Sequence, residues 1–385
     1  MRIMKSRPGE ELDAFAARAH QQAAGVSVAL YFPPQGELQR TAEAMQRAFP
    51  ESLTLGVATV RLIDGGVFES NRTLLFLFDK DDEDIRADAM LLENISKAPV
   101  SYVLGVQRRV EALGPVENDN MVCLEFCTNS EEMLVTTLTA MLAPLNVPLF
   151  GGSAFHTDIL VKPPAEVHFM VAWQGRLYED ACIALFLKNM RGCIKLYREI
   201  FYEVRKETPM HLATKVDTER RKLLELDDRP AAEVYSEETG IDPEAILSHV
   251  LDRPIGRMLG NEVFVISMRN VAHDGSLDTI KSVNLNDAIY IMQLGDYEQR
   301  WRETCARICR EVPERQLVFS VECYHRYMFY ETHGLMATLP RQRAETLGRI
   351  YGVVSGGEQI RGQNANQTGL FLVFEGKGGG AHEVE

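Results

Sequence analysis

The sequence has no apolar run close to the ~20 residues that a membrane-spanning helix needs, so it predicts no transmembrane segment. Residues 1–7 are basic, but no apolar stretch follows them, and this pattern predicts no secretory signal. Lys and Arg number 41 and Asp and Glu number 55, which gives a formal charge of −14. This acidic excess disfavours nucleic acid and anionic membranes as partners, because both are themselves anionic. We therefore expect a cytoplasmic protein that binds neither.

Cysteine is scarce and scattered, and none of the seven stands in a C-x-x-C pair. An odd, scattered set predicts reduced thiols rather than a disulfide framework. Cys123 and Cys127 have a spacing that metal sites use, but no second Cys or His pair stands nearby, so we predict no metal site.

The motifs of common enzyme classes are also missing. The sequence has no G-x-S-x-G elbow, no P-loop, no H-E-x-x-H and no G-x-G-x-x-G. We therefore predict no catalytic residue and no enzyme. One alternative stays open, in which Cys323 acts as a nucleophile with His325 or His156 as its base. We also detect no internal repeat in the sequence.

Short apolar runs predict a series of strands, separated by helical patterns. The main predicted strands are residues 25–32, 55–60, 73–78, 100–106, 121–126 and 316–321. The apolar spacing of residues 37–49 predicts an amphipathic helix between the first two strands. Such alternation favours a layered sheet with helices packed on it.

The length of 385 residues is too great for one small core and predicts two domains. We predict a mixed α/β (α+β) fold in which each domain is a mixed β-sheet covered by helices. The charged segment that ends at Pro209 sets the predicted domains at residues 1–212 and 213–375. Residues 376–385, which are rich in glycine, are predicted to be a flexible tail.

Residues 351–375, YGVVSGGEQIRGQNANQTGLFLVFE, carry the strongest signal for a site. Gly356 and Gly357 allow close backbone approach, and Glu358 follows them directly. A carboxylate between two buried runs must be paired, protonated or bound to a partner. The pattern predicts a small polar pocket in an apolar wall, with polar residues 363–368 beside it. The alternative is a hairpin corner in which Glu358 caps backbone N–H groups.

A second glycine pair occurs at Gly151 and Gly152, before Ser153. Backbone N–H groups of such a segment can form a concavity of the size of an anion. His156 lies just beyond. The alternative is a turn between a strand and a loop, with a surface histidine.

Five segments carry a resemblance to a known family: 148–154 (PLFGGSA), 222–227 (KLLELD) with Pro230, Ala231 and Tyr235, 318–320 (VFS) with Cys323 and Arg326, Gly357-Glu358, and 366–368 (NQT). In this order and spacing they resemble the motifs of FIST-domain proteins, which are prokaryotic sensory modules with an N-terminal and a C-terminal half. The resemblance extends over residues 25–374. It fails at residues 56–61 (GVATVR), where the family often has a cysteine and a glutamate.

The resemblance implies a stand-alone bacterial signal-transduction module that binds a small amino-acid-like metabolite. A separate partner, such as a histidine kinase or a chemoreceptor, would receive the signal. The candidate ligand-binding residues are Glu358, Gly357, Arg326, Asn366, Thr368, Gly151, Gly152, Ser153 and His156. In this hypothesis Glu358 pairs with a ligand ammonium group, and Arg326 or the amides of residues 151–153 take a carboxylate.

Some FIST proteins are similar in outline but bind haem and respond to nitric oxide. A haem-binding sensor is therefore the alternative function, and haem is the one cofactor that the resemblance allows. Its axial ligand would be a histidine, and the candidates are His156, His168, His211 and His325. The sequence does not distinguish among these four.

Overall fold

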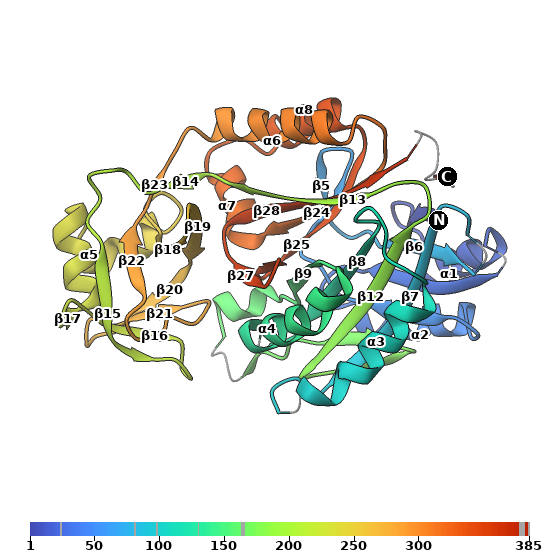
Figure 1. The fold of residues 1–385 in the computed structure, drawn as a ribbon, viewed down its shortest axis with the longest axis horizontal. Helices are drawn as coiled ribbons and strands as arrows, with labels where there is room; N and C mark the ends of the chain where they lie inside the picture. The colour runs from blue at the N-terminus through green and yellow to red at the C-terminus, as the bar shows by residue number, and fades with distance from the viewer. Residues whose placement is uncertain are drawn as a thin grey trace.

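The computed structural model describes residues 1–23, 25–80, 82–97, 99–129, 131–162, 166–376 and 382–383. Figure 1 shows a large main body, which carries both chain termini, and a smaller lobe at its side. The predicted fold class is confirmed, since the chain forms several mixed β-sheets with helices packed on them.

The main body consists of three units with the same order of elements. Each unit has a first strand, a helix, a central strand, one or two further helices, a strand parallel to the central strand, a hairpin and a last strand. The first unit contains β1 (Arg2–Lys5), α1 (Leu12–Gln21), β2 (Val26–Phe32), α2 (Leu38–Ala48), β3 (Leu53–Gly56), β4 (Leu62–Asp64), β5 (Val67–Glu69) and β6 (Leu74–Asp79). The second contains β7 (Ile85–Glu93), α3 (Val103–Ala112), β8 (Met121–Cys127), α4 (Glu131–Leu142), β9 (Leu149–Ser153), β10 (Val171–Trp173), β11 (Arg176–Tyr178) and β12 (Ala181–Asn189). The third contains β13 (Ile194–Ile200), α6 (Tyr297–Glu311), β24 (Arg315–Cys323), α7 (Tyr324–Thr332), α8 (Leu339–Leu347), β25 (Ile350–Ser355), β26 (Glu358–Ile360), β27 (Gln363–Ala365) and β28 (Thr368–Glu375).

Strand pairing repeats in the same way. The central strands β2, β8 and β24 pair in parallel with β3, β9 and β25. On their other side they pair antiparallel with β6, β12 and β28, which in turn pair with the first strands β1, β7 and β13. Each unit therefore contains a β-α-β crossover, flanked by two antiparallel strands.

The three units are linked by exchange of their hairpins. Hairpin β4–β5 of the first unit pairs with β25 of the third, β10–β11 of the second pairs with β3 of the first, and β26–β27 of the third pairs with β9 of the second. Each sheet is therefore completed by a hairpin from another unit, and the donation closes into a cycle. No sequence repeat marks this topological repeat.

The lobe is inserted in the third unit, between β13 and α6. Its elements are β14 (Tyr202–Glu203), β15 (His211–Asp217), β16 (Lys222–Leu226), β17 (Arg229–Pro230), α5 (Ala231–Thr239), β18 (Ile255–Leu259), β19 (Glu262–Ile266), β20 (Met268–Val271), β21 (Leu277–Thr279), β22 (Ala288–Ile291) and β23 (Gln293–Leu294). The chain enters through β14 and leaves through β23, and these two strands pair antiparallel. This two-stranded neck is visible at the top of the lobe in Figure 1.

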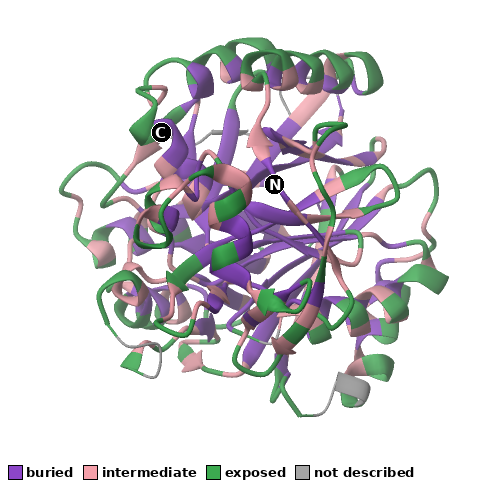
Figure 2. Ribbon diagram, turned by 90° about the vertical axis from the view of Figure 1, so that its left-hand side faces the viewer, coloured by how far each residue is buried: buried purple, intermediate pink, exposed green. Residues whose placement is uncertain are grey.

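The core lies where the three sheets face one another. Phe32 of β2 contacts Phe126 of β8 and Phe319 of β24, with ring centroids 5.3 and 5.8 Å apart. These residues belong to one apolar cluster to which all three units contribute. The helices pack on the outer faces of the sheets, and Figure 2 shows buried strands inside and exposed residues along the outer helices.

Two details of the sequence analysis need comment. The predicted strand at 100–106 is wrong, because this segment leads into helix α3, whose Val106 and Val110 share one buried face. Of the predicted tail, residues 377–381 and 384–385 lie outside the described residues, whereas β29 (His382–Glu383) pairs with β1. The domain ranges 1–212, 213–375 and 376–385 stay predictions.

Candidate functional site

The two glycine segments that the sequence analysis singled out lie side by side. Glu358 of β26 is the register partner of Gly152 of β9. The backbone N–H of Ser153 donates to the carbonyl of Gly357 at 2.9 Å, and that of Gly356 donates to the carbonyl of Ser153 at 3.1 Å. The hairpin exchange between the second and third units therefore brings together residues that are about two hundred positions apart.

Glu358 is fully buried among groups of its own chain. Its Oε2 accepts from the hydroxyl and the N–H of Thr368, at 2.8 and 3.3 Å, and its Oε1 lies 3.4 Å from the hydroxyl of Ser355. Burial raises the pKa of this carboxyl to about 8, although hydrogen bonds from Thr368 and Cys323 oppose the rise. The structure thus brings together Glu358 and Thr368, two of the predicted site residues, but they hydrogen-bond to each other. Their role in ligand binding stays a prediction.

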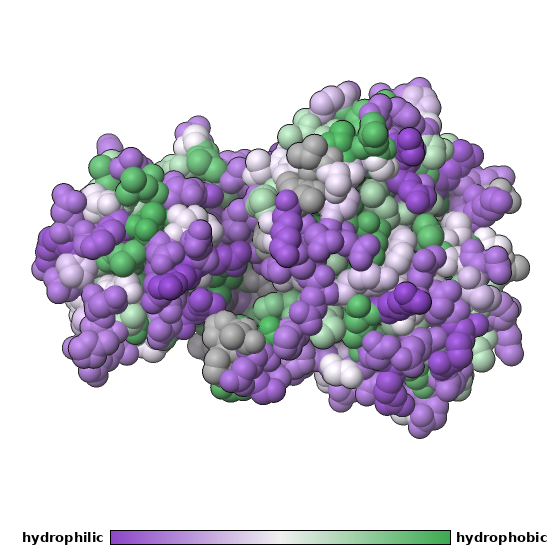
Figure 3. Space-filling model, turned by 90° about the horizontal axis from the view of Figure 1, so that it is seen from below, coloured by the Kyte–Doolittle hydropathy of each residue, from purple (hydrophilic) through white to green (hydrophobic). Residues whose placement is uncertain are grey.

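Asn366 lies at a polar seam between hairpin β26–β27 and the lobe. Its Oδ1 accepts from the N–H of Ser267 at 3.3 Å, and the ammonium of Lys281 donates to the carbonyl of Asn364 at 2.9 Å. Lys281 is almost completely buried, and this desolvation lowers its pKa to about 7. We call this contact region, in which Asn364 and Asn366 meet Ser267 and Lys281 of the lobe, the lobe seam. Seen from below, the surface is hollowed where the lobe meets the main body (Figure 3).

Arg326 belongs to a buried ion-pair network on the α7 side of β24, and its guanidinium lies close to Gly369, the residue after Thr368. It forms ion pairs with Glu199 and with Glu322, the latter at 2.8 Å, and its Nε donates to the hydroxyl of Tyr330 at 2.6 Å. Arg343 pairs with the same two carboxylates. The guanidinium of Arg326 is therefore occupied by groups within the chain.

His156 lies elsewhere again, beside a cavity of about 270 Å³ that His168 also lines. The other lining residues are mostly apolar, among them Leu38, Phe169 and Met170. The Nδ1 of His156 accepts from the N–H of Asp158 at 3.1 Å. We call this space the histidine cavity, and it contains two of the four histidines proposed as haem ligands.

The other two histidines have different surroundings. His211 lies between Asp227 and Glu238, with contacts of 2.6 and 2.7 Å, and these carboxylates raise the pKa of its imidazole against the opposing effect of burial. Desolvation lowers the pKa of His325 to about 4. Cys323, its proposed nucleophilic partner, is buried, and this raises the pKa of its thiol well above the ordinary value. A nucleophilic cysteine needs the opposite shift.

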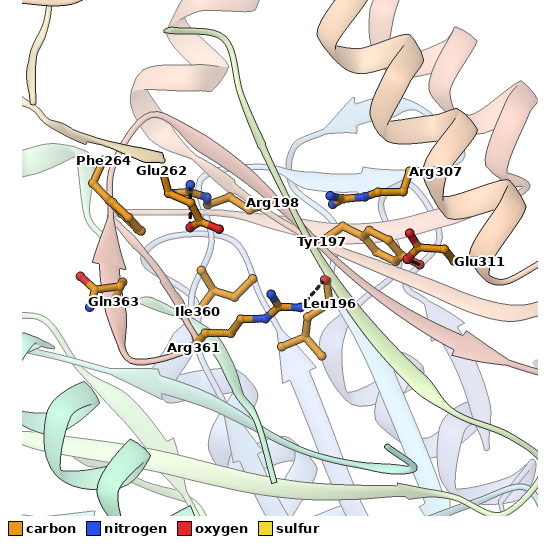
Figure 4. A pocket seen from close by; sticks show the side chains of 10 residues that line it. All are labelled: Leu196, Tyr197, Arg198, Glu262, Phe264, Arg307, Glu311, Ile360, Arg361 and Gln363. Atoms are coloured by element: carbon orange, nitrogen blue, oxygen red, sulfur yellow. Dashed lines mark hydrogen bonds and ion pairs between the residues drawn. The ribbon is translucent and has the colours of Figure 1, made fainter. Parts of the chain in front are cut away.

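A larger cavity, of about 340 Å³, lies at the junction of the lobe, β13, helix α6 and hairpin β26–β27 (Figure 4). We call it the junction cavity. Its lining residues are Leu196, Tyr197, Arg198, Glu262, Phe264, Arg307, Glu311, Ile360, Arg361 and Gln363. The segment 351–375 therefore does contribute to a cavity, but through the tip of its hairpin rather than through Glu358.

Of the three arginines that line the junction cavity, Arg198 has a carboxylate partner among the described residues, and Arg307 and Arg361 have none. Arg198 bonds Glu262 at 3.1 Å and lies 4.1 Å from the centroid of the Phe264 ring. Arg361 makes one long hydrogen bond, 3.4 Å, to the carbonyl of Leu196, and Arg307 lies over the ring of Tyr197. Within the described part of the chain, neither Arg307 nor Arg361 has a carboxylate at ion-pair distance. Figure 4 shows these two side chains entering from the helix and from the hairpin.

The sequence analysis did not identify these arginines. Arg361 stands within the segment 351–375, and this position was its one signal in the sequence. In the structure it lies at a hairpin corner, where its φ is +48°. Arg307 cannot be distinguished by pattern from the other arginines of helix α6, most of which face solvent.

Neither a metal-binding cluster nor a membrane-spanning helix is found among the described residues. These residues contain no group of three or more His, Cys, Asp or Glu side chains arranged to hold a metal ion. They also contain no helix that combines the length and apolarity needed to cross a bilayer.

Comparison with known families gives two matches that together cover most of the chain. The FIST N domain matches residues 27–229, and the FIST C domain matches residues 231–361. No curated protein was found to match the chain. FIST domains are associated with signal transduction and the sensing of small ligands. The chain belongs to the FIST family.

Proposed function

We propose that this protein is a cytoplasmic signal-sensing module that binds a small amino-acid-like metabolite in the junction cavity. A partner protein, such as a histidine kinase or a chemoreceptor, would receive the signal. The proposal rests on one observation: Arg307 and Arg361 reach a cavity that also contains Glu262 and Glu311, and neither arginine is neutralised by a described carboxylate.

The lining suits a zwitterion. A guanidinium binds a carboxylate through two parallel hydrogen bonds, so Arg361 and Arg307 suit the ligand's acid group. Glu311 is the carboxylate for a ligand ammonium; its Oε2 accepts from the hydroxyl of Tyr197 at 3.1 Å, and its Oε1 lies 3.7 Å from Arg310, with which the ammonium would compete. The volume of about 340 Å³ lies within the ~300–1,000 Å³ range of small-molecule pockets.

The position of the cavity suits signalling as well as binding. Glu262 and Phe264 belong to the lobe, whereas Arg307 and Arg361 belong to the main body. A ligand that contacts both parts would bind better to one arrangement of lobe and body than to another. Such differential binding is what allows a ligand to shift a conformational equilibrium.

Isothermal titration calorimetry with the amino acids, and with the corresponding dicarboxylates and amines, tests the proposal. Arg361→Gln should weaken binding of the best ligand by about 10- to 150-fold, the equivalent of about 1.5–3 kcal/mol for a charged hydrogen bond. Arg302→Gln is the matched control, since Arg302 lies on α6, faces solvent and pairs with Glu298. Equal affinities for wild type, Arg361→Gln and Arg307→Gln would rule out the junction cavity as the ligand site.

Haem binding is a second candidate, because His156 and His168 line one mostly apolar cavity. Imidazole donors and an apolar wall are suited to haem, and bound haem would supply gas-binding iron chemistry. The volume of about 270 Å³ lies below the ~300–1,000 Å³ range of small-molecule pockets, so the cavity would have to enlarge. Protein purified from haem-supplemented cells should then show a Soret band, and His156→Ala or His168→Ala should shift or abolish it. A wild-type protein without the band would exclude this candidate.

A further inference from the structure

A second cavity of about 340 Å³ lies where helix α7 begins, beside loops of the first unit. Its lining residues are Pro34, Gln35, Val60, Arg61, Ser70, Asn71, Thr157, Tyr324, Tyr327 and Glu331. We call it the tyrosine cavity. It shares no lining residue with the junction cavity.

The topology favours a ligand at this position. Strands β24 and β25 are parallel, and Tyr324 follows the carboxyl end of β24 directly. In open α/β sheets, ligands bind outside the carboxyl ends of parallel strands, where the chain turns into the helices. The donated hairpin β4–β5 pairs with β25 on the far side from β24, and Arg61 immediately precedes this hairpin. Thr157 comes from the second unit, so all three units of the main body contribute to the lining of the cavity.

Aromatic rings form one wall. Tyr324, Tyr327 and Glu331 stand at i, i+3 and i+7 and therefore share one face of α7. The ring of Tyr324 packs on Phe155 with centroids 4.7 Å apart, and it lies nearly parallel to the ring of Tyr327, 6.1 Å away. Contacts on both sides hold the Tyr324 ring in place, so the wall is formed before any ligand arrives.

Arg61 supplies the charge. Its guanidinium carbon lies 5.6 Å from the centroid of the Tyr327 ring, and its Nη1 donates to its neighbour's carbonyl, that of Val60, at 2.9 Å. No carboxylate of the described residues lies at ion-pair distance from it. The arginine therefore retains most of its five N–H donors for a ligand, at the edge of an aromatic wall.

The opposite side of the cavity is fixed by Gln35. Its amide nitrogen donates to the carbonyl of Phe155 at 2.8 Å, and its amide oxygen accepts from the hydroxyl of Thr157 at 2.9 Å. These bonds connect the loop after β2 with the loop after β9. Two of the loops that line the cavity are thus fixed to each other, which reduces the entropy that ligand binding would cost.

We infer that the tyrosine cavity binds a small planar aromatic carboxylate, with its ring against the edges of Tyr324 and Tyr327 and its carboxylate on Arg61. Aromatic pairs in offset or edge-on contact supply attraction beyond simple burial, and a guanidinium matches a carboxylate in shape. Glu331 lies in the same cavity, so a second acidic group on the ligand is disfavoured. The site is independent of the amino-acid-like ligand proposed for the junction cavity.

Benzoate is the probe for the first experiment. Its binding to the full chain is measured by ligand-observed NMR and by calorimetry. Benzoate should bind, whereas benzamide, its neutral counterpart, and cyclohexanecarboxylate, which lacks the aromatic face, should each bind at least about 10-fold more weakly. This comparison needs no variant and so does not depend on the folding of a mutant. Failure of benzoate to bind at millimolar concentration overturns the inference. Displacement of benzoate by an equal concentration of inorganic phosphate also overturns it, because it would indicate a simple anion site.

Variants then locate the site. Arg61→Gln should weaken benzoate binding at least about 10-fold, and Tyr327→Leu should weaken it as well. Arg40→Gln is the control for loss of an exposed arginine. Arg361→Gln should leave benzoate binding unchanged, which separates this inference from the function proposed for the junction cavity. Unchanged affinity in Arg61→Gln would show that benzoate binds elsewhere and would overturn the assignment.

Discussion

Replacement of Lys281 by Met tests how the lobe is held against the main body. The side chain is 1 % exposed, and its one hydrogen bond in the described chain goes to the carbonyl of Asn364 at 2.9 Å. Burial lowers the pKa of the ammonium from 10.5 to about 7; Arg257 adds to the decrease and Glu132 opposes it. The difference, 10.5 − 7, is about 3.5 units and corresponds to about 5 kcal/mol, since one unit is worth about 1.4 kcal/mol.

The sign of the effect follows from proton binding. The pKa of Lys281 is lower in the folded chain, so between pH 7 and 10.5 the unfolded chain holds a proton that the folded chain has lost. Lys281 therefore destabilises the fold increasingly as the pH falls from 10.5 towards 7. Methionine has no charge to desolvate. The free energy of unfolding of Lys281→Met should exceed that of wild type near pH 7.5, even after loss of a hydrogen bond worth about 1 kcal/mol.

The advantage of the variant should shrink by about 1.4 kcal/mol per pH unit between pH 7.5 and 9.5. Urea unfolding of both proteins at pH 7.5, 8.5 and 9.5 measures this difference directly. Lys206→Met is the matched control, because Lys206 is exposed, and its difference from wild type should not vary with pH. A constant difference between Lys281→Met and wild type over this range would refute the claim that the amine is desolvated in the folded protein.

Two further predictions concern the glycine and glutamate segments. The raised pKa of Glu358, about 8, means that the folded chain keeps a proton between pH 4.5 and 8 that the unfolded chain loses, so its stabilising effect is present below pH 4.5 and disappears as the pH rises through 8. The free energy of unfolding should therefore fall less steeply between pH 5 and 8 in Glu358→Gln than in wild type, and equal slopes in urea titrations would contradict this. In Gly151→Ala, the new Cβ would lie 2.0 Å from the carbonyl oxygen of Glu125, so β8 and β9 must separate and stability should fall by at least about 1–3 kcal/mol. Thermal unfolding checks this against Gly105→Ala, where the nearest atom is the mobile end of Met90, and an unchanged melting temperature for Gly151→Ala would contradict the expected clash.

The strands of the core could be predicted because a buried strand is a short run of apolar, β-prone residues in the sequence. Residues 73–78 and 316–321 are apolar, β-prone runs, and they coincide closely with β6 and the centre of β24. Residues 100–106 were misread for the same reason, since β-branched residues also occupy helices when one face is buried, as Val106 and Val110 show. Local patterns thus identify buried segments more reliably than they identify the type of element.

The exchange of hairpins could not be predicted, because no local pattern specifies which sheet a hairpin will join. The strands of β4–β5 are three residues each and would pair equally well, by pattern, with their own sheet. What determines their place is the geometry of the assembled core, to which all three units contribute side chains. The same exchange explains why Gly152 and Glu358, which the sequence analysis grouped by chemistry alone, prove to be register partners.

Each donated hairpin stands beside a parallel strand pair, and the three resulting positions have different chemistry. The hairpin of the first unit borders the tyrosine cavity with Arg61, and that of the second borders the histidine cavity with His168. The hairpin of the third unit meets the lobe instead, through Lys281 and Asn366 at the lobe seam. One topology therefore provides two open cavities and one position that the inserted lobe covers. Because the lobe also contributes Glu262 to the junction cavity, a ligand bound there contacts the same lobe that covers the third position, and ligand binding and the lobe seam must be energetically coupled whenever the lobe moves as a unit.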